Sequence, residues 1–184
     1  DEPVALKLLR PEIAEDPGML ERFRNEVKLA RRVTHPSVAR MFELGTADGQ
    51  RFLTMELVLG ESLASVLERE GRLDVPRALR VAIGIADALV AAHAASVFHR
   101  DIKPDNVLVE PGGRVAVTDF GIARHLVSGD ADLAGTPAYM APEQARGERH
   151  VDGRTAVWAM CVLLYAMLTG IRPFHGPNYN ALIH

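Results

Sequence analysis

The sequence has almost no cysteine, little net charge and no apolar leader. Cys161 is the single cysteine among 184 residues, so no internal disulfide can form, which is typical of a reducing compartment. The net charge of −3 gives no basis for bulk electrostatic binding to nucleic acid or to an anionic membrane. Charged residues are interspersed from Asp1 onward, so no signal peptide is visible there. We expect a cytoplasmic chain, although a longer protein could carry a membrane anchor elsewhere.

One long run of residues, from 155 to 171, contains no charge. Its length lies at the lower end of the range of about 17–25 residues that crosses a bilayer. Gly170 and Pro173 interrupt the run early, and lysine and arginine do not flank it asymmetrically. We therefore expect a buried core helix without membrane contact, with a membrane span as the remaining alternative.

The first third of the sequence predicts a small sheet and one helix. Apolar residues alternate with others from residue 4 to 9, which is typical of a strand. Asp16-Pro17 is an N-cap followed by a first-turn proline, and apolar residues then recur at three- and four-residue spacing. The expected elements are strands over 4–9, 38–44 and 51–58 and a helix over 18–33.

The composition becomes helical after Gly60. We therefore expect a sheet-rich part, residues 1–59, and a mostly helical part, residues 60–184. No sustained periodicity runs from 123 to 147, so this segment is expected to be a long loop. The other expected elements are helices over 63–70 and 75–95 and a hairpin of strands 107–109 and 115–117. The sequence contains no internal repeat and no low-complexity segment.

Two oxygen-bearing side chains flank the expected hairpin. Asn106 directly precedes its first strand, and Asp119 closely follows its second. Antiparallel pairing brings those two ends side by side, which suits an oxygen-preferring ion such as Mg²⁺. Asn and Asp are also common turn formers at strand ends, which is the alternative for an isolated pair. Asp101 and Lys103 lie a few residues before Asn106 and favour a functional site.

The stretch around these residues matches a known pattern. Residues 99–108 read His-Arg-Asp-Ile-Lys-Pro-Asp-Asn-Val-Leu and resemble the catalytic loop of protein Ser/Thr kinases. Asp119-Phe120-Gly121 is similar to the metal-binding triplet of that family. The segment from Gly135 to Glu143 resembles the end of the activation segment that docks substrate, and Glu143-Gln144-Ala145 is similar to eukaryotic-like (Hanks-type) bacterial members.

The resemblance implies an α+β, two-lobed protein-kinase-like fold with a small sheet-plus-helix N-lobe and a mostly helical C-lobe. It also implies transfer of the ATP γ-phosphate to a Ser/Thr hydroxyl of a protein substrate, with Mg²⁺. By this resemblance Asp101 is the catalytic base, and Lys103 neutralises the transferred group. Asn106 and Asp119 would hold the metal ions.

The resemblance extends to the nucleotide site in residues 1–59. Val4-Ala5-Leu6-Lys7 is similar to the strand whose lysine orients the phosphates, and Glu26 would be its helix partner. Residues 51–58 resemble the strand and hinge that read adenine. The residues implied to contact the base are Ala5, Met55 as gatekeeper, the backbone of Glu56 and Val58, and Leu108.

The chain departs from the family pattern at three places. The Gly-rich loop of the family lies upstream of its Lys7-type strand, and the family continues with further helices after the position of His184, so we expect a fragment truncated at both ends. Within the chain, Ala156 occupies a position where the family usually has an aspartate that holds the catalytic loop. The alternative function is therefore a catalytically impaired kinase-fold fragment, or pseudokinase, that acts as a binding or regulatory module.

Overall fold

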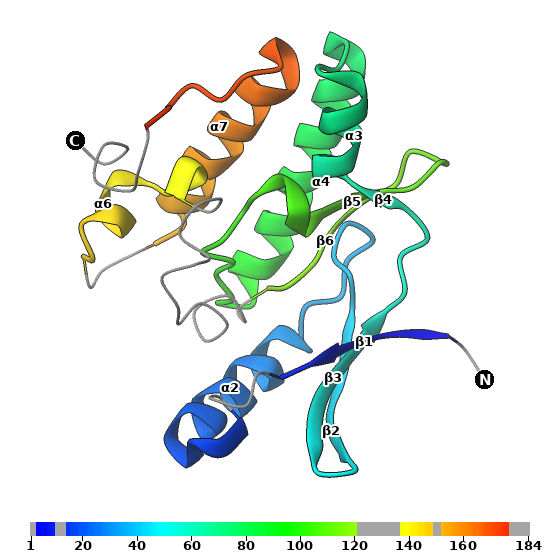
Figure 1. The fold of residues 1–184 in the computed structure, drawn as a ribbon, viewed down its shortest axis with the longest axis vertical. Coiled ribbons are helices and arrows are strands. Elements are labelled where there is room, and N and C mark those ends of the chain that lie inside the picture. The colour runs from blue at the N-terminus through cyan, green and yellow to red at the C-terminus, as the bar shows by residue number, and fades with distance from the viewer. Residues whose placement is uncertain (1–2, 10–13, 121–136, 149–151, 177–184) are drawn as a thin grey trace.

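The computed structural model describes residues 3–9, 14–120, 137–148 and 152–176. A three-stranded antiparallel sheet contains β1 (Val4–Leu8), β2 (Met41–Ala47) and β3 (Gln50–Glu56) in the order β1-β3-β2. Helix α2 (Pro17–Ala30) lies beside this sheet, at the end of the molecule opposite the larger helices (Figure 1). The expected strand is confirmed over Val4–Leu8, and alternate burial along β1 turns Ala5 and Lys7 inward.

Helix α2 forms for the reasons visible in its sequence. The Asp16 carboxylate accepts hydrogen bonds from the backbone N–H groups of Gly18 at 2.8 Å and Met19 at 2.9 Å. One face of the helix is buried through Leu20, Phe23, Val27 and Ala30. The helix ends at Ala30, three residues earlier than predicted.

The expected strand over 38–44 is partly wrong. The strand β2 begins only at Met41, because Val38 and Ala39 pair with the second sheet instead. Val38 forms a parallel bridge with Val117, and the Ala39 N–H donates to the Val117 carbonyl at 2.9 Å. This crossing joins the two sheets of the molecule.

The second half of the structure is mostly helical. A small sheet has the order β4-β5-β6, and the described residues also contain two 3₁₀ turns and a short helix between the larger elements. The elements are β4 (Glu61–Ser62), α3 (Leu63–Glu70), α4 (Val75–Ala94), η1 (Pro104–Asn106), β5 (Val107–Val109), β6 (Val115–Val117), η3 (Pro137–Tyr139), α6 (Pro142–Ala145) and α7 (Arg154–Thr169). The predicted helices and hairpin are confirmed, but η3 and α6 lie inside the segment that was expected to be a structureless loop, and β4 was missed.

The uncharged run forms a core helix. Helix α7 packs against α4 (Figure 1), and its buried residues include Ala156, Ala159, Leu163 and Met167. Within the described residues, no helix combines the length and apolar character that a membrane span requires. The expectation of a buried helix is confirmed.

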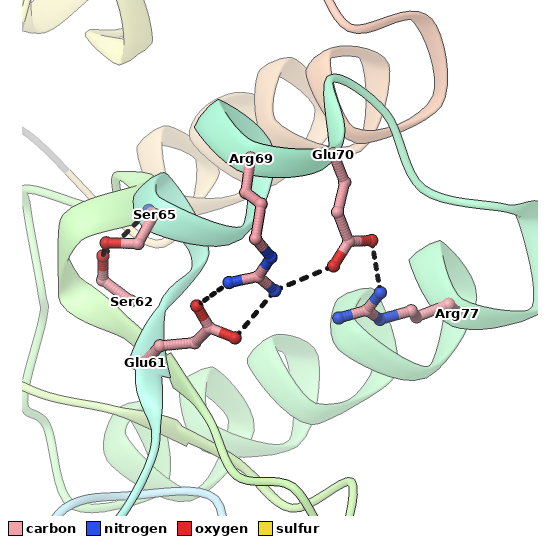
Figure 2. A network of polar contacts seen from close by, with 6 residues as sticks. All are labelled: Glu61, Ser62, Ser65, Arg69, Glu70 and Arg77. Carbon is pink, nitrogen blue, oxygen red and sulfur yellow. Dashed lines mark hydrogen bonds and ion pairs between the residues drawn. The ribbon is translucent and has the colours of Figure 1, made fainter.

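Gly60 lies where the chain enters the second half. A Cβ atom on this residue would lie 2.5 Å from the Val109 carbonyl oxygen, so only glycine permits so close an approach of the two backbones. A chain of ion pairs follows it, from Glu61 through Arg69 and Glu70 to Arg77, linking β4, α3 and α4 (Figure 2). Glu61 and Arg69 remain largely exposed, so these pairs contribute little to stability.

A partly buried ion pair connects the end of β3 to the hairpin. Arg114 Nη1 contacts the Glu56 carboxylate at 2.7 Å, and Arg114 Nε donates to the Pro36 carbonyl at 2.8 Å. The other carboxylate oxygen of Glu56 accepts from the Arg40 N–H at 3.1 Å. Burial acts to raise the pKa of the Glu56 carboxyl, but the hydrogen bonds from Arg114 and Arg40 outweigh it and hold that pKa below its usual value.

We expect Glu56→Gln to lower the free energy of unfolding by about 1–2 kcal/mol at pH 7, because one partner of a charge-assisted hydrogen bond is lost. A carboxyl whose folded-state pKa is depressed stabilises the fold above its unfolded pKa and ceases to do so as the pH falls through the folded pKa. The difference between wild type and variant should therefore begin to shrink below the unfolded pKa of about 4.3 and approach zero only below the lower folded-state pKa. Urea unfolding between pH 7 and pH 3.5 measures both values.

The matched control is Glu43→Gln, which removes an exposed carboxylate from β2 and should change stability by less than about 0.5 kcal/mol. Equal stability of wild type and Glu56→Gln at pH 7, or a difference that persists at low pH, would show that the pair does not join these segments.

Candidate active site

The hairpin brings its two ends together as the sequence predicted. The 3₁₀ turn η1 ends at Asn106, directly before β5, and Thr118 and Asp119 follow β6. The Thr118 N–H donates to the Asn106 carbonyl at 3.0 Å, so the two segments lie side by side. The Asn106 side chain is buried and donates to the Asp101 carbonyl at 2.9 Å.

Asp101 is the centre of a small polar cluster on the loop before η1. Lys103 Nζ lies 3.1 Å from Asp101 Oδ2, and Asn106 Nδ2 lies 3.4 Å from the same oxygen. The Asp101 side chain is only 10% exposed, and that of Lys103 is 23% exposed. The cluster therefore presents one carboxylate, one ammonium group and one amide within a sheltered volume.

Asp119 is held from the opposite side by the first sheet. Its Oδ2 atom lies 2.8 Å from Lys7 Nζ on β1. Its Oδ1 atom is buried and has no hydrogen-bond partner among the described residues. The backbone of Asp119 adopts φ 65°, in the left-handed region. A buried carboxylate oxygen without a partner is costly, so this atom is a natural ligand for a cation.

The donor set fits Mg²⁺ rather than a metal held by protein groups alone. No cluster of three or more His, Cys, Asp or Glu side chains with metal-binding geometry occurs among the described residues. Mg²⁺ is usually bound through one or two carboxylates together with water and substrate phosphates. Asp119 and the neighbouring Asn106 provide such a partial set, with Lys7 as an additional positive charge for an anionic ligand.

His99 is a structural support for this cluster. It is 1% exposed and packs edge-on against Phe120, with ring centroids 4.7 Å apart. His99 Nε2 lies 2.7 Å from the Thr118 carbonyl oxygen, and Nδ1 accepts the Asp101 N–H at 3.3 Å. These partners assign the proton to Nε2. Burial lowers the pKa of His99, which keeps the ring neutral near pH 7.

The residues implied to contact a nucleotide lie on three elements. Ala5 on β1 is paired with Met55 on β3, and Thr118 Oγ1 is 3.6 Å from Met55 Sδ, next to Asp119. Val58 is buried and packs with Leu108 from β5. Glu56 lies between Met55 and Val58 along the chain, and its side chain is paired with Arg114.

Glu26 lies on α2, within the helix that the sequence predicted. It follows the buried Phe23 by one turn and precedes the buried Ala30 by another, and one of its carboxylate oxygens is buried. Glu26 therefore lies at the edge of the buried face of α2. The pairing of Glu26 with Lys7 stays a prediction.

A small cavity lies beneath the loop, beside Ala156. Its lining includes Arg100, Asp101, Tyr139, Gln144 and Ala156. The cavity volume is about 10 Å³, measured as the space open to the centre of a water molecule. Gln144 donates from Nε2 to the Arg100 carbonyl at 2.9 Å. Sequence reasoning missed this contact, because Gln144 lies in a segment without periodicity.

A larger cavity of about 750 Å³ lies elsewhere, between residues 58–61, the start of α4 and the turn after β5. None of Lys7, Asp101, Asn106 and Asp119 lines it. We place the candidate site at the polar cluster, because charge and hydrogen-bonding groups converge there. Residues 121–136, which include Gly121 of the triplet and the start of the 135–143 segment, lie outside the described residues.

Comparison with known proteins gives the family. The protein kinase domain model matches residues 1–184. The chain is 41% identical over 191 residues to the serine/threonine-protein kinase pkn3 of Myxococcus xanthus, an alignment that covers 97% of this chain and 35% of that protein. It is also 41% identical over 182 residues to the serine/threonine-protein kinase PknA of Mycobacterium tuberculosis, covering 94% of this chain and 42% of PknA.

A third relative, the probable serine/threonine-protein kinase PknB of Corynebacterium glutamicum, is 36% identical over 191 residues, covering 98% of this chain and 29% of PknB. The chain thus spans less than half the length of these relatives. The expected α+β, two-lobed fold agrees with the family and with the two sheets and flanking helices described above. The chain belongs to the protein kinase family and resembles its bacterial serine/threonine members over most of its length.

Proposed function

We propose that this chain is the catalytic core of an ATP-dependent protein Ser/Thr kinase. The observation that carries the proposal is Asp119, which is paired with Lys7 through one oxygen and has a buried second oxygen with no partner in the part of the chain that the structure describes. This arrangement supports a site for a metal ion together with an anionic ligand, next to Thr118, whose N–H donates to the carbonyl of Asn106 in the Asp101 cluster. Membership of the family gives the reaction class, transfer of the ATP γ-phosphate.

The proposed roles follow from charge and position. Asp101 accepts the proton of a Ser/Thr hydroxyl as it attacks the γ-phosphate, and its contact with Asn106 fixes the direction of its carboxylate. Lys103, beside Asp101, lowers the repulsion between that carboxylate and the transferred phosphoryl group. Bound Mg²⁺ would neutralise phosphate charge, and Asn106 and Asp119 are the residues that would hold it.

The proposed nucleotide site uses the first sheet and the connection after it. The Lys7 ammonium group would leave Asp119 and contact the α- and β-phosphates, and Glu26 would orient the Lys7 side chain. Met55 would limit access behind the base, and the backbone of Glu56 and Val58 would hydrogen-bond adenine. Ala5 and Leu108 would cover its two faces. Residues 1–59 and 60–184 would then be the two lobes around the nucleotide.

The proposed partners are ATP and a protein substrate with a Ser or Thr acceptor. We name residues 99–106 the catalytic loop and residues 137–145 the docking segment, which would bind the substrate near the acceptor. Neither nucleic acid nor a membrane is needed by this chain in the proposed function. The location would be the cytoplasm, with any membrane anchor in another part of a longer protein.

The alternative is a binding or regulatory module with the kinase fold. The observation that favours it is Ala156, whose methyl group faces the small cavity below Arg100 and Asp101. A catalytic loop with less support below it would hold Asp101 less firmly, and transfer would slow without loss of nucleotide binding.

Asp101→Asn separates the two functions. In a kinase, loss of the general base should lower the rate of phosphoryl transfer to protein by about 10²- to 10⁴-fold, with nucleotide affinity unchanged within about twofold. Transfer of labelled γ-phosphate and equilibrium ATP binding, both in the complete protein, measure these quantities. Asp105→Asn, an exposed carboxylate in the same loop, is the matched control and should retain transfer.

A wild-type protein that binds Mg²⁺·ATP but transfers no phosphate would support the module instead. Wild-type protein that neither binds nor transfers would contradict both functions.

Ala156→Asp tests the support of the catalytic loop. The new carboxylate would enter the cavity and accept a backbone N–H of the loop, a charge-assisted hydrogen bond worth about 1.5–3 kcal/mol. We expect a higher melting temperature and a higher turnover number. Ala156→Asn, which offers a weaker neutral acceptor, should give a smaller gain. Unchanged melting temperature and turnover in Ala156→Asp would contradict this account of the position.

A further inference from the structure

The side chain of Gln144 joins two segments that are distant in sequence. Its Nε2 atom donates to the Arg100 carbonyl of the catalytic loop at 2.9 Å. Its Oε1 atom accepts the Ala141 N–H of the docking segment at 3.2 Å. Both ends of the amide are therefore engaged, and a flipped amide would place donor against donor and acceptor against acceptor.

The contact at Arg100 acts on the peptide unit next to Asp101. The Arg100 carbonyl and the Asp101 N–H belong to one planar peptide group, so they cannot rotate independently. The carbonyl accepts from Gln144, and the N–H donates to His99 Nδ1 at 3.3 Å. Gln144 and His99 thus hold this peptide plane from its two opposite sides.

The peptide unit needs this support because of its backbone conformation. Arg100 adopts φ 64°, a left-handed conformation that is unfavourable for a residue with a side chain. Such a conformation persists only where neighbouring groups fix it. In the cavity below, helix α7 presents the methyl groups of Ala156 and Ala159, which form no hydrogen bond, and Thr155, whose hydroxyl donates to the Asp152 carbonyl at 2.8 Å. Polar support from this side of the loop comes from Gln144.

The contact at Ala141 fixes the docking segment in the same way. Ala141 is fully buried at the N-cap of α6, and the Gln144 oxygen satisfies its N–H, which is the return half of a capping box. Tyr139 and Met140 of the docking segment line the same small cavity as Arg100 and Asp101. A shift of either segment would therefore strain the Gln144 side chain.

We propose that Gln144 is a positioning residue that couples the docking segment to the orientation of Asp101. The proposal rests on the proposed kinase function for its catalytic consequence, since Gln144 itself would not touch the reacting atoms. It predicts that the donor half of the amide controls turnover, whereas the acceptor half mainly stabilises the start of α6.

Two variants of Gln144 separate these halves. Gln144→Glu keeps an acceptor for the Ala141 N–H but places a carboxylate against the Arg100 carbonyl. Gln144→Lys keeps a donor for that carbonyl and loses the acceptor. Gln50, the only other glutamine in the sequence, is exposed at the start of β3, so Gln50→Glu and Gln50→Lys are matched controls.

In the complete protein we expect Gln144→Glu to lower kcat about tenfold and to leave KM for ATP within twofold. The variant loses the hydrogen bond to the Arg100 carbonyl, and about 1.4 kcal/mol corresponds to a factor of ten. Gln144→Lys should keep kcat within about threefold of wild type, although its melting temperature is the lower of the two. Both Gln50 variants should match wild type. A purely structural role would make kcat follow the melting temperature across the series, and that result would overturn the proposal.

Hydrogen exchange gives a second readout that does not need activity. The amide of Asp101 should exchange several-fold faster in Gln144→Glu than in wild type and Gln144→Lys, and equal exchange in all three would overturn the proposal. Absence of phosphoryl transfer in wild type would instead count against the proposed function, and the exchange rates would then decide on the coupling alone.

Discussion

The ion pair between Lys7 and Asp119 is the contact on which the site depends. It joins a strand of the first sheet to the chain segment that leaves the hairpin, with 2.8 Å between the charged atoms. The Lys7 side chain is 37% exposed and that of Asp119 only 17%. The ammonium group therefore lies between the Asp119 carboxylate and solvent. A second anionic group could approach Lys7 from that side without breaking the fold.

The position of Asp119 is set by local constraints around it. Arg100 and Asp119 both have left-handed backbones, and each such residue costs of order 1–3 kcal/mol. His99 connects the two segments, because its ring contacts the Thr118 carbonyl and the Asp101 N–H. Individual hydrogen bonds contribute about 0.5–1.5 kcal/mol, so a few of them offset this strain. The fold therefore holds two unfavourable conformations at its polar cluster.

Parts of the structure that depend on near neighbours could be predicted from the sequence. Asp16-Pro17 predicts the start of α2, and the short turn at residues 111–113 predicts the hairpin that brings Asn106 close to Thr118 and Asp119. Apolar composition predicts α4 and α7, because both helices are largely buried. Local signals of this kind therefore predict that Asn106 and Asp119 lie close together, but not the contact with Lys7.

Contacts between distant residues could not be predicted from local patterns. Val38 leaves the first sheet to pair with Val117, which shortens the expected strand, and Arg114 reaches Pro36 across 78 positions. The helix α6 has only four residues, which is too few to show a period. The contacts of Gln144 with Arg100 and Ala141 therefore could not be predicted. The contact between Lys7 and Asp119 was not predicted, because the family pattern implied only that each residue serves the nucleotide site, with Glu26 as the partner of Lys7.

The account depends most on Asp119, which would hold a metal ion bound to a nucleotide whose phosphates Lys7 would contact. Calorimetric titration of the complete protein with ATP, with and without Mg²⁺, tests it most directly. We predict that Mg²⁺ tightens ATP binding at least about tenfold in wild type, which is about 1.4 kcal/mol, and has no effect in Asp119→Asn. ATP binding that ignores Mg²⁺ in wild type, or an equal effect of Mg²⁺ in both proteins, would contradict the account.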